Sequence, residues 1–237
     1  MKSSGILIVG DEVLSGEVRD ENGPFLIARL SALGSRVVRL VAVPDREDEI
    51  VRELQALRGA ADAVVVSGGI GPTHDDLTRP AVARAVGVPI ERHAEAEAHV
   101  RRWYGDRTTV AELSMADLPR GSRLLRGART TSLGFCVAGV YVLPGVPSLL
   151  RDLVEGMASE FAGPPLHKEE VHTDLREGEI ADALGRIQAA SLDVAIGSYP
   201  SIGSDGHWHT KIVVRSPDAA RSTAVAVAIR ATFASLR

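Results

Sequence analysis

The sequence predicts an α/β protein with a mostly parallel sheet and helices on both of its faces, followed by a small α+β domain. Three short apolar runs, each typical of a strand buried on both faces, alternate with two stretches that space their apolar residues as helices do. The runs lie at 5–10, 37–43 and 62–67, and the helical stretches lie at 22–33 and 45–57. This alternation implies βαβ units and therefore parallel strands.

The rest of the first domain follows the same pattern less regularly. We expect further helices at 77–86, 94–104 and 147–161, and strands near 135–138 and 140–143. Pro147 opens the last of these helices, since proline is favoured in a first helical turn. Residues 1–162 are therefore expected to form one domain.

Gly163-Pro164-Pro165 breaks the pattern and marks the expected domain boundary. The segment beyond it reads strand, helix, strand, strand, helix, so residues 166–237 are expected to form a small βαββα domain. We expect these elements at 168–174, 177–190, 193–199, 208–215 and 218–236.

Composition narrows the possible functions. The 237 residues are 45% hydrophobic but 4% aromatic, so the core is expected to be aliphatic. A net charge of −4 argues against a nucleic-acid binder, although backbone N–H groups can still bind a phosphate locally. Cys136 is the single cysteine, and its apolar neighbours favour a buried thiol without a chemical role. The N-terminal apolar run is too short for a signal peptide or a membrane span, so we expect a cytoplasmic protein.

Two loops follow the carboxyl ends of predicted parallel strands, where ligands bind in open α/β sheets. They cover residues 10–16 and 68–78. The second loop has three glycines that let its backbone approach a ligand and aim N–H groups at it. A helix that begins near Asp76 adds the positive end of its dipole, so this loop is expected to bind an anion.

Carboxylates lie beside this predicted anion site. Asp75 and Asp76 in the second loop, with Asp11 and Glu12 in the first, would repel a phosphate unless a divalent cation stood between them. The combination predicts a metal–phosphate site. The alternative is that Asp75 or Asp76 only caps the following helix. The dinucleotide fingerprint and the Walker lysine are both missing.

Two other clusters leave alternatives open. His207 and His209 share one face of a strand and could bind a metal, but a solvated hairpin face is favoured because no third ligand is near in sequence. Residues 101–104, Arg-Arg-Trp-Tyr, could grip a phosphate or stack a base, or could form a partly buried helix end. His93 and His99 are expected at the surface.

Several motifs resemble the CinA family of competence- and damage-inducible proteins. They are Val9–Gly16 with Asp20 and Asn22, then Ser67–Thr78, Leu143–Ser148, Glu179–Ala181 and Gly197–Pro200. The resemblance covers nearly the whole chain. It implies the fold of MoaB/Mog-type molybdopterin-binding proteins, which is also that of the N-terminal module of eukaryotic FAD synthases.

The resemblance also implies ligands and activities. CinA proteins are associated with metal-dependent hydrolysis of ADP-ribose pyrophosphate, and the FAD synthase module with hydrolysis of FAD. Mog-type relatives bind molybdopterin, with acidic residues at positions that match Asp45 and Asp76. A homodimer is implied as well. Longer CinA proteins carry a nicotinamide-nucleotide amidase domain, and we expect that activity to be absent because the chain ends at Arg237.

The sequence departs from the family pattern at three places: Leu149, where the family has Glu, residues 114–118, and residues 130–133. Each departure is expected to touch a pocket wall. The departures favour binding without turnover.

We therefore predict a CinA-like hydrolase of nucleotide pyrophosphates, of the ADP-ribose or FAD class, that uses Co²⁺ or Mg²⁺. The predicted catalytic and metal-binding residues are Asp11, Asp75 and Asp76, and the predicted ligand-binding residues are Gly10, Glu12, Asp45, Gly68, Gly69, Gly71, Pro72, Thr73, Thr78, Pro144, Gly145, Pro147 and Ser148. One alternative is a protein that binds molybdopterin or a nucleotide without hydrolysis. Another is a nucleotide-sensing partner in an assembly.

Overall fold

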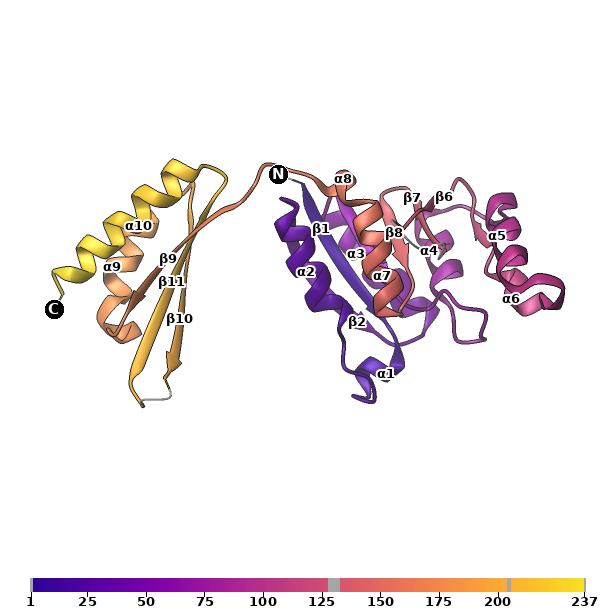
Figure 1. Ribbon diagram of the computed structural model, residues 1–237, viewed down its shortest axis with the longest axis horizontal. Helices are drawn as coiled ribbons and strands as arrows, with labels where there is room; N and C mark the ends of the chain where they lie inside the picture. The colour runs from indigo at the N-terminus through magenta and orange to yellow at the C-terminus, as the bar shows by residue number, and fades with distance from the viewer. Residues whose placement is uncertain (1, 128–132, 204–205, 237) are drawn as a thin grey trace. The chain divides into compact units, whose positions relative to one another are not determined.

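The chain forms two compact units, Met1–Gly163 and Pro164–Arg237 (Figure 1). The computed structural model describes residues 2–127, 133–203 and 206–236. Each unit has a hydrophobic core of its own. Within the described residues, no helix combines the length and the apolar character needed to cross a membrane.

The first unit is built on a six-stranded sheet. Its strands are β1 (Ser3–Val9), β2 (Arg36–Val43), β3 (Ala63–Ser67), β6 (Arg123–Leu125), β7 (Gly134–Val137) and β8 (Val140–Leu143). They lie in the order β2-β1-β3-β8-β7-β6. The first four in this order are parallel, and β7 and β6 are antiparallel to their neighbours. The expected mostly parallel sheet is therefore confirmed.

Helices and a small ribbon complete the first unit. The helices are α1 (Asp11–Leu14), α2 (Asn22–Ala32), α3 (Glu47–Ala60), α4 (Thr78–Val86), α5 (Ala94–Tyr104), η1 (Gly105–Arg107), α6 (Val110–Ser114), α7 (Pro147–Gly156) and α8 (Ala158–Phe161). The ribbon pairs β4 (Ile90–Arg92) with β5 (Asp117–Pro119).

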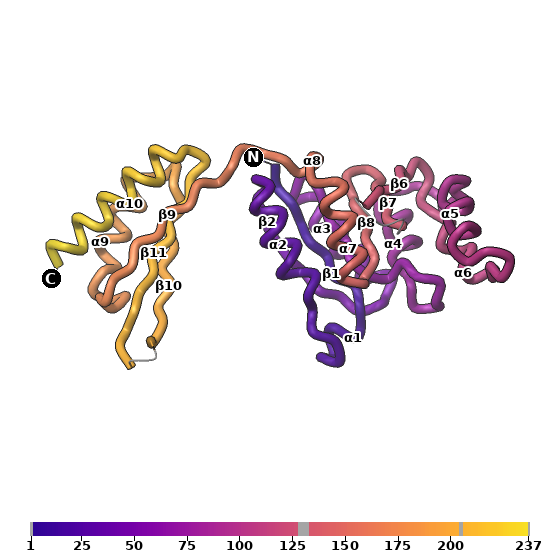
Figure 2. The backbone as a smooth tube through the Cα atoms, in the orientation of Figure 1, coloured from indigo at the N-terminus to yellow at the C-terminus, as the bar shows by residue number. Residues whose placement is uncertain are grey.

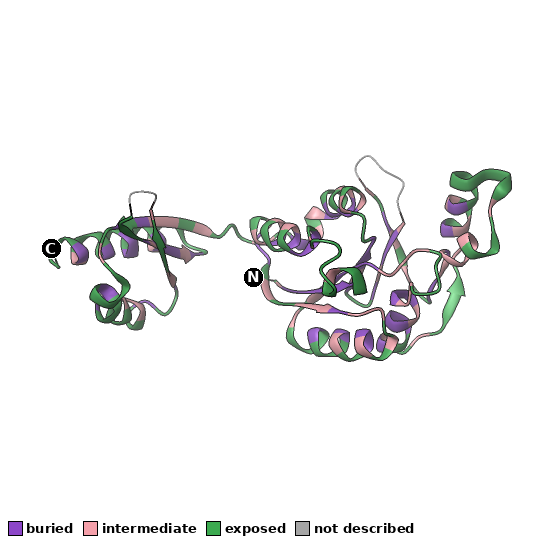
Figure 3. Ribbon diagram, turned by 90° about the horizontal axis from the view of Figure 1, so that it is seen from below, coloured by how far each residue is buried: buried purple, intermediate pink, exposed green. Residues whose placement is uncertain are grey.

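The central strands are apolar throughout because helices cover both faces of the sheet. In β1, Leu7 and Val9 pack with α3 and α4 on one face, whereas Ile6 and Ile8 pack with α2 and α7 on the other. Buried residues accordingly lie in the strands and on the sheet-facing sides of the helices (Figure 3). This two-sided burial explains the continuous apolar runs that predicted the parallel sheet.

The structure differs from the sequence-based expectation in its short elements. The helix expected at 147–161 is interrupted at Met157. Gly156 ends its first part, and a Cβ atom there would overlap the carbonyl oxygen of Arg126. The elements α1, α6, β4, β5 and β6 were not expected, because runs of three to five residues show no clear periodicity.

The second unit is a small α+β fold, as expected. It contains β9 (His167–Thr173), α9 (Glu177–Ala189), β10 (Ala195–Ile202), β11 (Trp208–Ser216) and α10 (Ala219–Ala234). The strands form an antiparallel sheet in the order β10-β11-β9. Ile180 from α9 and Ile229 from α10 pack on Ile212 of this sheet to form its core.

Candidate functional site

The loops that the sequence singles out lie at one edge of the six-stranded sheet. Because β2, β1, β3 and β8 are parallel neighbours, the segments that follow them emerge at the same edge, which we call the carboxyl edge. The backbone trace shows the first of these connections, where β1 leads into α1 (Figure 2). Residues 10–16 follow β1, and Asp45 follows β2. Residues 68–77 follow β3, and residues 144–148 follow β8. We call residues 68–77 the glycine loop.

Four carboxylates at this edge, Asp11, Glu12, Asp45 and Asp75, influence one another. The backbone N–H of Asp11 donates to Asp45 Oδ2 at 2.8 Å, which ties the first loop to the end of β2. Burial raises the pKa of Asp45, and the negative charges of the other three carboxylates raise it further, against the opposing hydrogen bond from Asp11. The negative charges of Asp11, Glu12 and Asp75 therefore act on Asp45, and we call these four side chains the acidic group.

At Gly68 and Gly69, the space that a side chain would fill is occupied by other atoms of the protein. Gly68 has φ +103°, and a Cβ atom there would overlap the carbonyl oxygen of Val9. Gly69 has φ +66°, and its Cβ atom would overlap Oγ1 of Thr78. The loop's own packing thus explains both glycines without a ligand.

Thr78, predicted to bind the ligand, is a structural residue. Its side chain is fully buried, and Oγ1 donates to the carbonyl oxygen of Gly68 at 2.8 Å. Its backbone N–H donates to the carbonyl oxygen of Gly69 at 3.0 Å. Thr78 therefore fixes the glycine loop to the start of α4, and its assignment as a ligand-facing residue is corrected.

Asp76 closes the glycine loop. Its carboxylate accepts hydrogen bonds from the backbone N–H groups of Gly71 at 2.7 Å and Thr73 at 2.9 Å, and from the Thr73 hydroxyl. These N–H groups, which were expected to hold phosphate oxygens, are therefore occupied by Asp76. The capping alternative is also wrong, because the N-cap of α4 is Leu77 and no side chain caps it.

Arg79 is a residue of this site that the sequence reasoning missed. It is buried, with 7% of its surface exposed, and its guanidinium donates to the carbonyl oxygens of Ile70 and of Gly71, the latter at 2.9 Å. Burial lowers its pKa, and the negative charges of Asp76 and Asp117 oppose that change. Its position directly after the glycine-loop motif was visible in the sequence, but its burial was not.

Asn22 was quoted only as part of a motif, and the structure places it at the carboxyl edge. It is 7% exposed, and its Nδ2 donates to Ser67 Oγ at 3.0 Å and to the carbonyl oxygen of Gly145 at 2.6 Å. Its Oδ1 is buried and accepts no hydrogen bond from the described residues. Asn22 thus joins α2, β3 and the loop after β8.

A pocket of about 680 Å³ opens beside the glycine loop. It is lined by Gly69, Ile70, Gly71, Asp76, His99, Val100, Trp103, Tyr104, Met115, Leu133, Pro144, Gly145, Val146 and Leu149. Of the predicted site residues, this lining includes Gly69, Gly71, Asp76, Pro144 and Gly145. It does not include Gly10, Asp11, Glu12, Asp45, Gly68, Pro72, Thr73, Asp75, Thr78, Pro147 or Ser148.

The three departures from the CinA pattern all reach this pocket. Met115, Leu133 and Leu149 belong to its walls, and at Leu149 the wall is apolar where the family pattern has Glu. Residues 130–132 of the third departure lie outside the described residues.

The described side chains do not form a complete metal site. Over residues 2–127, 133–203 and 206–236, no three His, Cys, Asp or Glu side chains converge so as to hold a metal ion. Neither the predicted set of Asp11, Asp75 and Asp76 nor the pair His207 and His209 therefore belongs to such a group.

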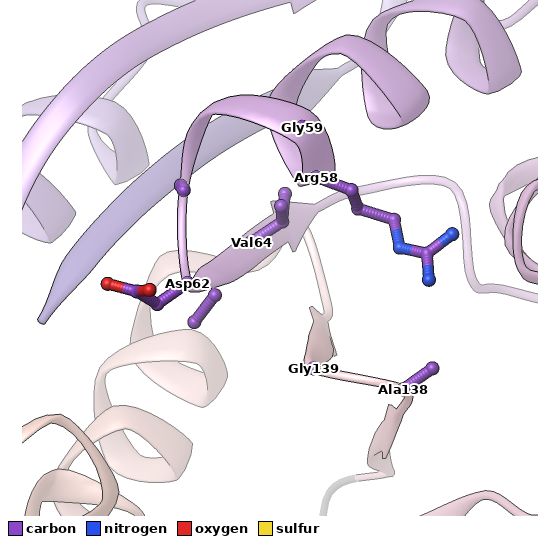
Figure 4. Close-up of a pocket in the computed structure, with 8 residues that line it drawn as sticks. Arg58, Gly59, Asp62, Val64, Ala138 and Gly139 are labelled. Carbon is purple, nitrogen blue, oxygen red and sulfur yellow. The ribbon is translucent and has the colours of Figure 1, made fainter.

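Features away from the carboxyl edge offer less chemistry. A smaller pocket of about 280 Å³ lies at the amino end of β3, and its lining includes Arg58, Asp62 and Gly139 (Figure 4). Arg58 donates to the carbonyl oxygen of Ala85, and the carboxylate of Asp62 accepts from Ser3, so both charges are already engaged. Burial raises the pKa of Cys136, which is half-buried in β7 and therefore not activated as a thiolate.

Comparison with known proteins places this fold. Residues 5–167, more than half of the chain, match the family described as "Probable molybdopterin binding domain", and residues 165–236 match "FAD synthase, middle domain". The structure of CinA from Thermoplasma acidophilum, described as of unknown function, is 32% identical with a TM-score of 0.63. The similarity covers 68% of this chain and 98% of that one.

Relatives of known sequence agree. A CinA-like protein of Citrifermentans bemidjiense is 42% identical over 167 residues, covering 67% of this chain and 40% of that protein. A CinA-like protein of Anaeromyxobacter dehalogenans is 35% identical over 241 residues, covering 92% of this chain and 56% of that protein. The chain thus spans about half the length of these relatives.

The fold and the carboxyl-edge pocket define an α/β protein of the molybdopterin-binding-domain class. Within that class, the chain belongs to the CinA-like family. The resemblance seen in the sequence motifs is therefore confirmed.

Proposed function

We propose that the first unit binds a ligand that joins a flat ring system to a phosphate, either a pterin or a nucleotide, in the carboxyl-edge pocket. The observation that carries this proposal is the pocket itself. Its lining combines glycine-loop residues with aromatic and apolar side chains and with the polar side chains of Asp76 and His99, and its volume is in the usual range for small-molecule sites. The family description that matches residues 5–167, which mentions molybdopterin, supports the same ligand class.

Hydrolysis of a nucleotide pyrophosphate of the ADP-ribose or FAD class is a second candidate function. Asp45 supports it, because a carboxylate whose pKa is raised by burial and by like charges is common at functional sites. Mg²⁺ is usually held by one or two carboxylates together with water and substrate phosphates. Asp11 and Asp75 would hold Mg²⁺ or Co²⁺ in this way, with a phosphate and water as the remaining ligands.

Two observations favour binding without turnover. The N–H groups of Gly71 and Thr73 donate to Asp76, so they do not present a free cradle for the charge that develops in hydrolysis. Leu149 also gives the pocket an apolar wall where the family pattern has a carboxylate.

Calorimetric titration of the full chain with ADP-ribose, FAD and molybdopterin tests the proposal. We expect saturable binding of at least one of them, and failure of all three would reject the ligand class. Chromatography of the same mixtures, with and without Mg²⁺ or Co²⁺, tests hydrolysis. Products that appear only with metal would support hydrolysis. Intact ligand under all conditions would reject hydrolysis and would support binding without turnover.

A further inference from the structure

One face of α5 presents a stripe of side chains to the carboxyl-edge pocket. His99 and Trp103 are four residues apart, as are Val100 and Tyr104, so the four lie on one side of the helix, and all four line the pocket. Trp103 is 70% exposed and Tyr104 is 37% exposed. A large exposed aromatic surface beside a pocket calls for an explanation, since tryptophan normally buries most of its area.

Trp103 does not anchor α5. The helix is held to the core by Ala96 and Val100, which are 0% and 1% exposed. On its outer side, Glu97 pairs with Arg92 and Arg101. The alternative of a partly buried helix end is therefore wrong for Trp103, and the stacking alternative remains.

The surroundings of Trp103 suit a flat ring. The pocket lining also includes Val146 and Leu149, which offer apolar contact. One turn before Trp103, burial and the charge of Arg102 lower the pKa of His99, which favours its neutral imidazole. Gly69, Gly71 and Asp76 add polar groups to the same lining.

We propose that Trp103, with Tyr104 beside it, stacks on the flat aromatic ring of a ligand bound in the carboxyl-edge pocket. This assignment rests on the proposed function and makes Trp103 its specificity-determining residue. It favours molecules with a nucleobase, pterin or flavin ring over phosphates without one. Stacking of a base on an aromatic side chain is tolerant of ring identity, so α5 would select for a ring and not for one particular base.

Fluorescence can report this contact directly, because the chain has two tryptophans and the other, Trp208, lies in the second unit. In the Trp208→Phe variant, Trp103 is the only tryptophan. We expect ADP-ribose to change its emission along the binding curve. In the Trp103→Phe variant, which reports Trp208 alone, the emission should stay constant although ADP-ribose still binds.

Affinity measurements provide the second test. Trp103→Ala removes an exposed side chain and should leave the fold intact, so we expect ADP-ribose and FAD to bind about 5- to 150-fold more weakly. Ribose 5-phosphate, which has no aromatic ring, should bind the variant and the wild type equally. Trp208→Ala is the matched control and should bind all three ligands like the wild type.

The outcomes separate the two proposals. If ADP-ribose or FAD binds the wild type and Trp103→Ala equally, or leaves Trp103 emission unchanged, the stacking role is rejected while the proposed function stands. If ADP-ribose, FAD and molybdopterin all fail to bind the wild type, the proposed function fails, and the stacking role fails with it.

Discussion

Asp76 belongs both to the glycine loop and to the pocket. Its carboxylate accepts three hydrogen bonds from Gly71 and Thr73, and the same side chain lines the pocket wall. A helix-capping Asp would tolerate Asn, because Asn accepts the capping bond equally well. An Asp that accepts on both oxygens does not, since Asn replaces one acceptor with a donor.

Asp76→Asn is therefore expected to lower the free energy of unfolding by about 1 kcal/mol, because at least one loop N–H loses its acceptor. Urea unfolding at pH 7 measures the change. Asp75→Asn is a useful comparison, because Asp75 is exposed and does not accept from Gly71. Equal midpoints for Asp76→Asn and the wild type would mean that Asp76 does not hold the loop.

The sequence was sufficient to predict which residues lie at the carboxyl edge, but it did not predict the contacts that each residue makes there. Strand ends placed Asp11, Asp45 and Asp76 correctly, because parallel neighbours end at one edge whatever their side chains do. The burial of Thr78 and the partners of Asp76 depend on how the loop folds back on itself. No periodicity in the sequence encodes that path.

The pKa values of carboxylates at the two ends of the parallel strands shift in opposite directions. Beyond the carboxyl end of β2, Asp45 is surrounded by the rest of the acidic group, and its pKa is raised. At the amino end of β3, the N–H and hydroxyl of Ser3 donate to Asp62, and they hold its pKa below the usual value. Like-charge repulsion therefore acts on Asp45 at the carboxyl edge, whereas hydrogen bonds stabilise the ionised form of Asp62.

Asp45→Asn is expected to raise the free energy of unfolding at pH 7 by a few tenths of a kcal/mol. A raised pKa means that the folded protein binds this proton more tightly than the unfolded chain does. The stability from Asp45 is thus present below the unfolded pKa, about 3.9, and is lost as pH rises through the folded value. Asn keeps an acceptor for Asp11 N–H and removes the charge. Urea unfolding from pH 7 to pH 4 should show the gain shrink with acidity.

Asp62→Asn is the matched control and should have the opposite sign. A lowered pKa gives stability that is present above the unfolded pKa and lost as pH falls through the folded value. The variant should therefore be less stable than the wild type at pH 7, and the difference should disappear in acid. The same sign for both variants would contradict the assignment of charge strain to the carboxyl edge.

Element length decided which elements could be predicted. The long helices repeat a period several times, and the strands β1, β2 and β3 contain apolar runs, so the sequence locates these elements within a few residues. Elements such as β4 and β6 have three residues each and form only because partners pair with them. For α6 a local signal did exist, since Thr109 and Glu112 form a capping box.

At the scale of the whole molecule, each unit buries its own core, and the site described here lies entirely in the first. The core of the first unit forms on both faces of the β1 and β3 strands, which carry the candidate loops at their ends. The second unit has a separate core around Ile212, and its sequence matches a different family. Ligand binding at the carboxyl edge should therefore respond to changes in the first unit.

Gly145→Val tests the central claim, that the carboxyl-edge pocket holds the ligand, most directly. Gly145 lines the pocket, and an added Cβ atom meets nothing closer than Gly68 Cα at 3.5 Å, so the variant should fold while its larger side chain takes up ligand space. Calorimetric titration with ADP-ribose, FAD and molybdopterin is the measurement, with the unfolding midpoint as the check on folding. We expect saturable binding of at least one of them to the wild type and at least about tenfold weaker binding to Gly145→Val. Equal affinity in a folded variant, or no binding to the wild type, would contradict the central claim.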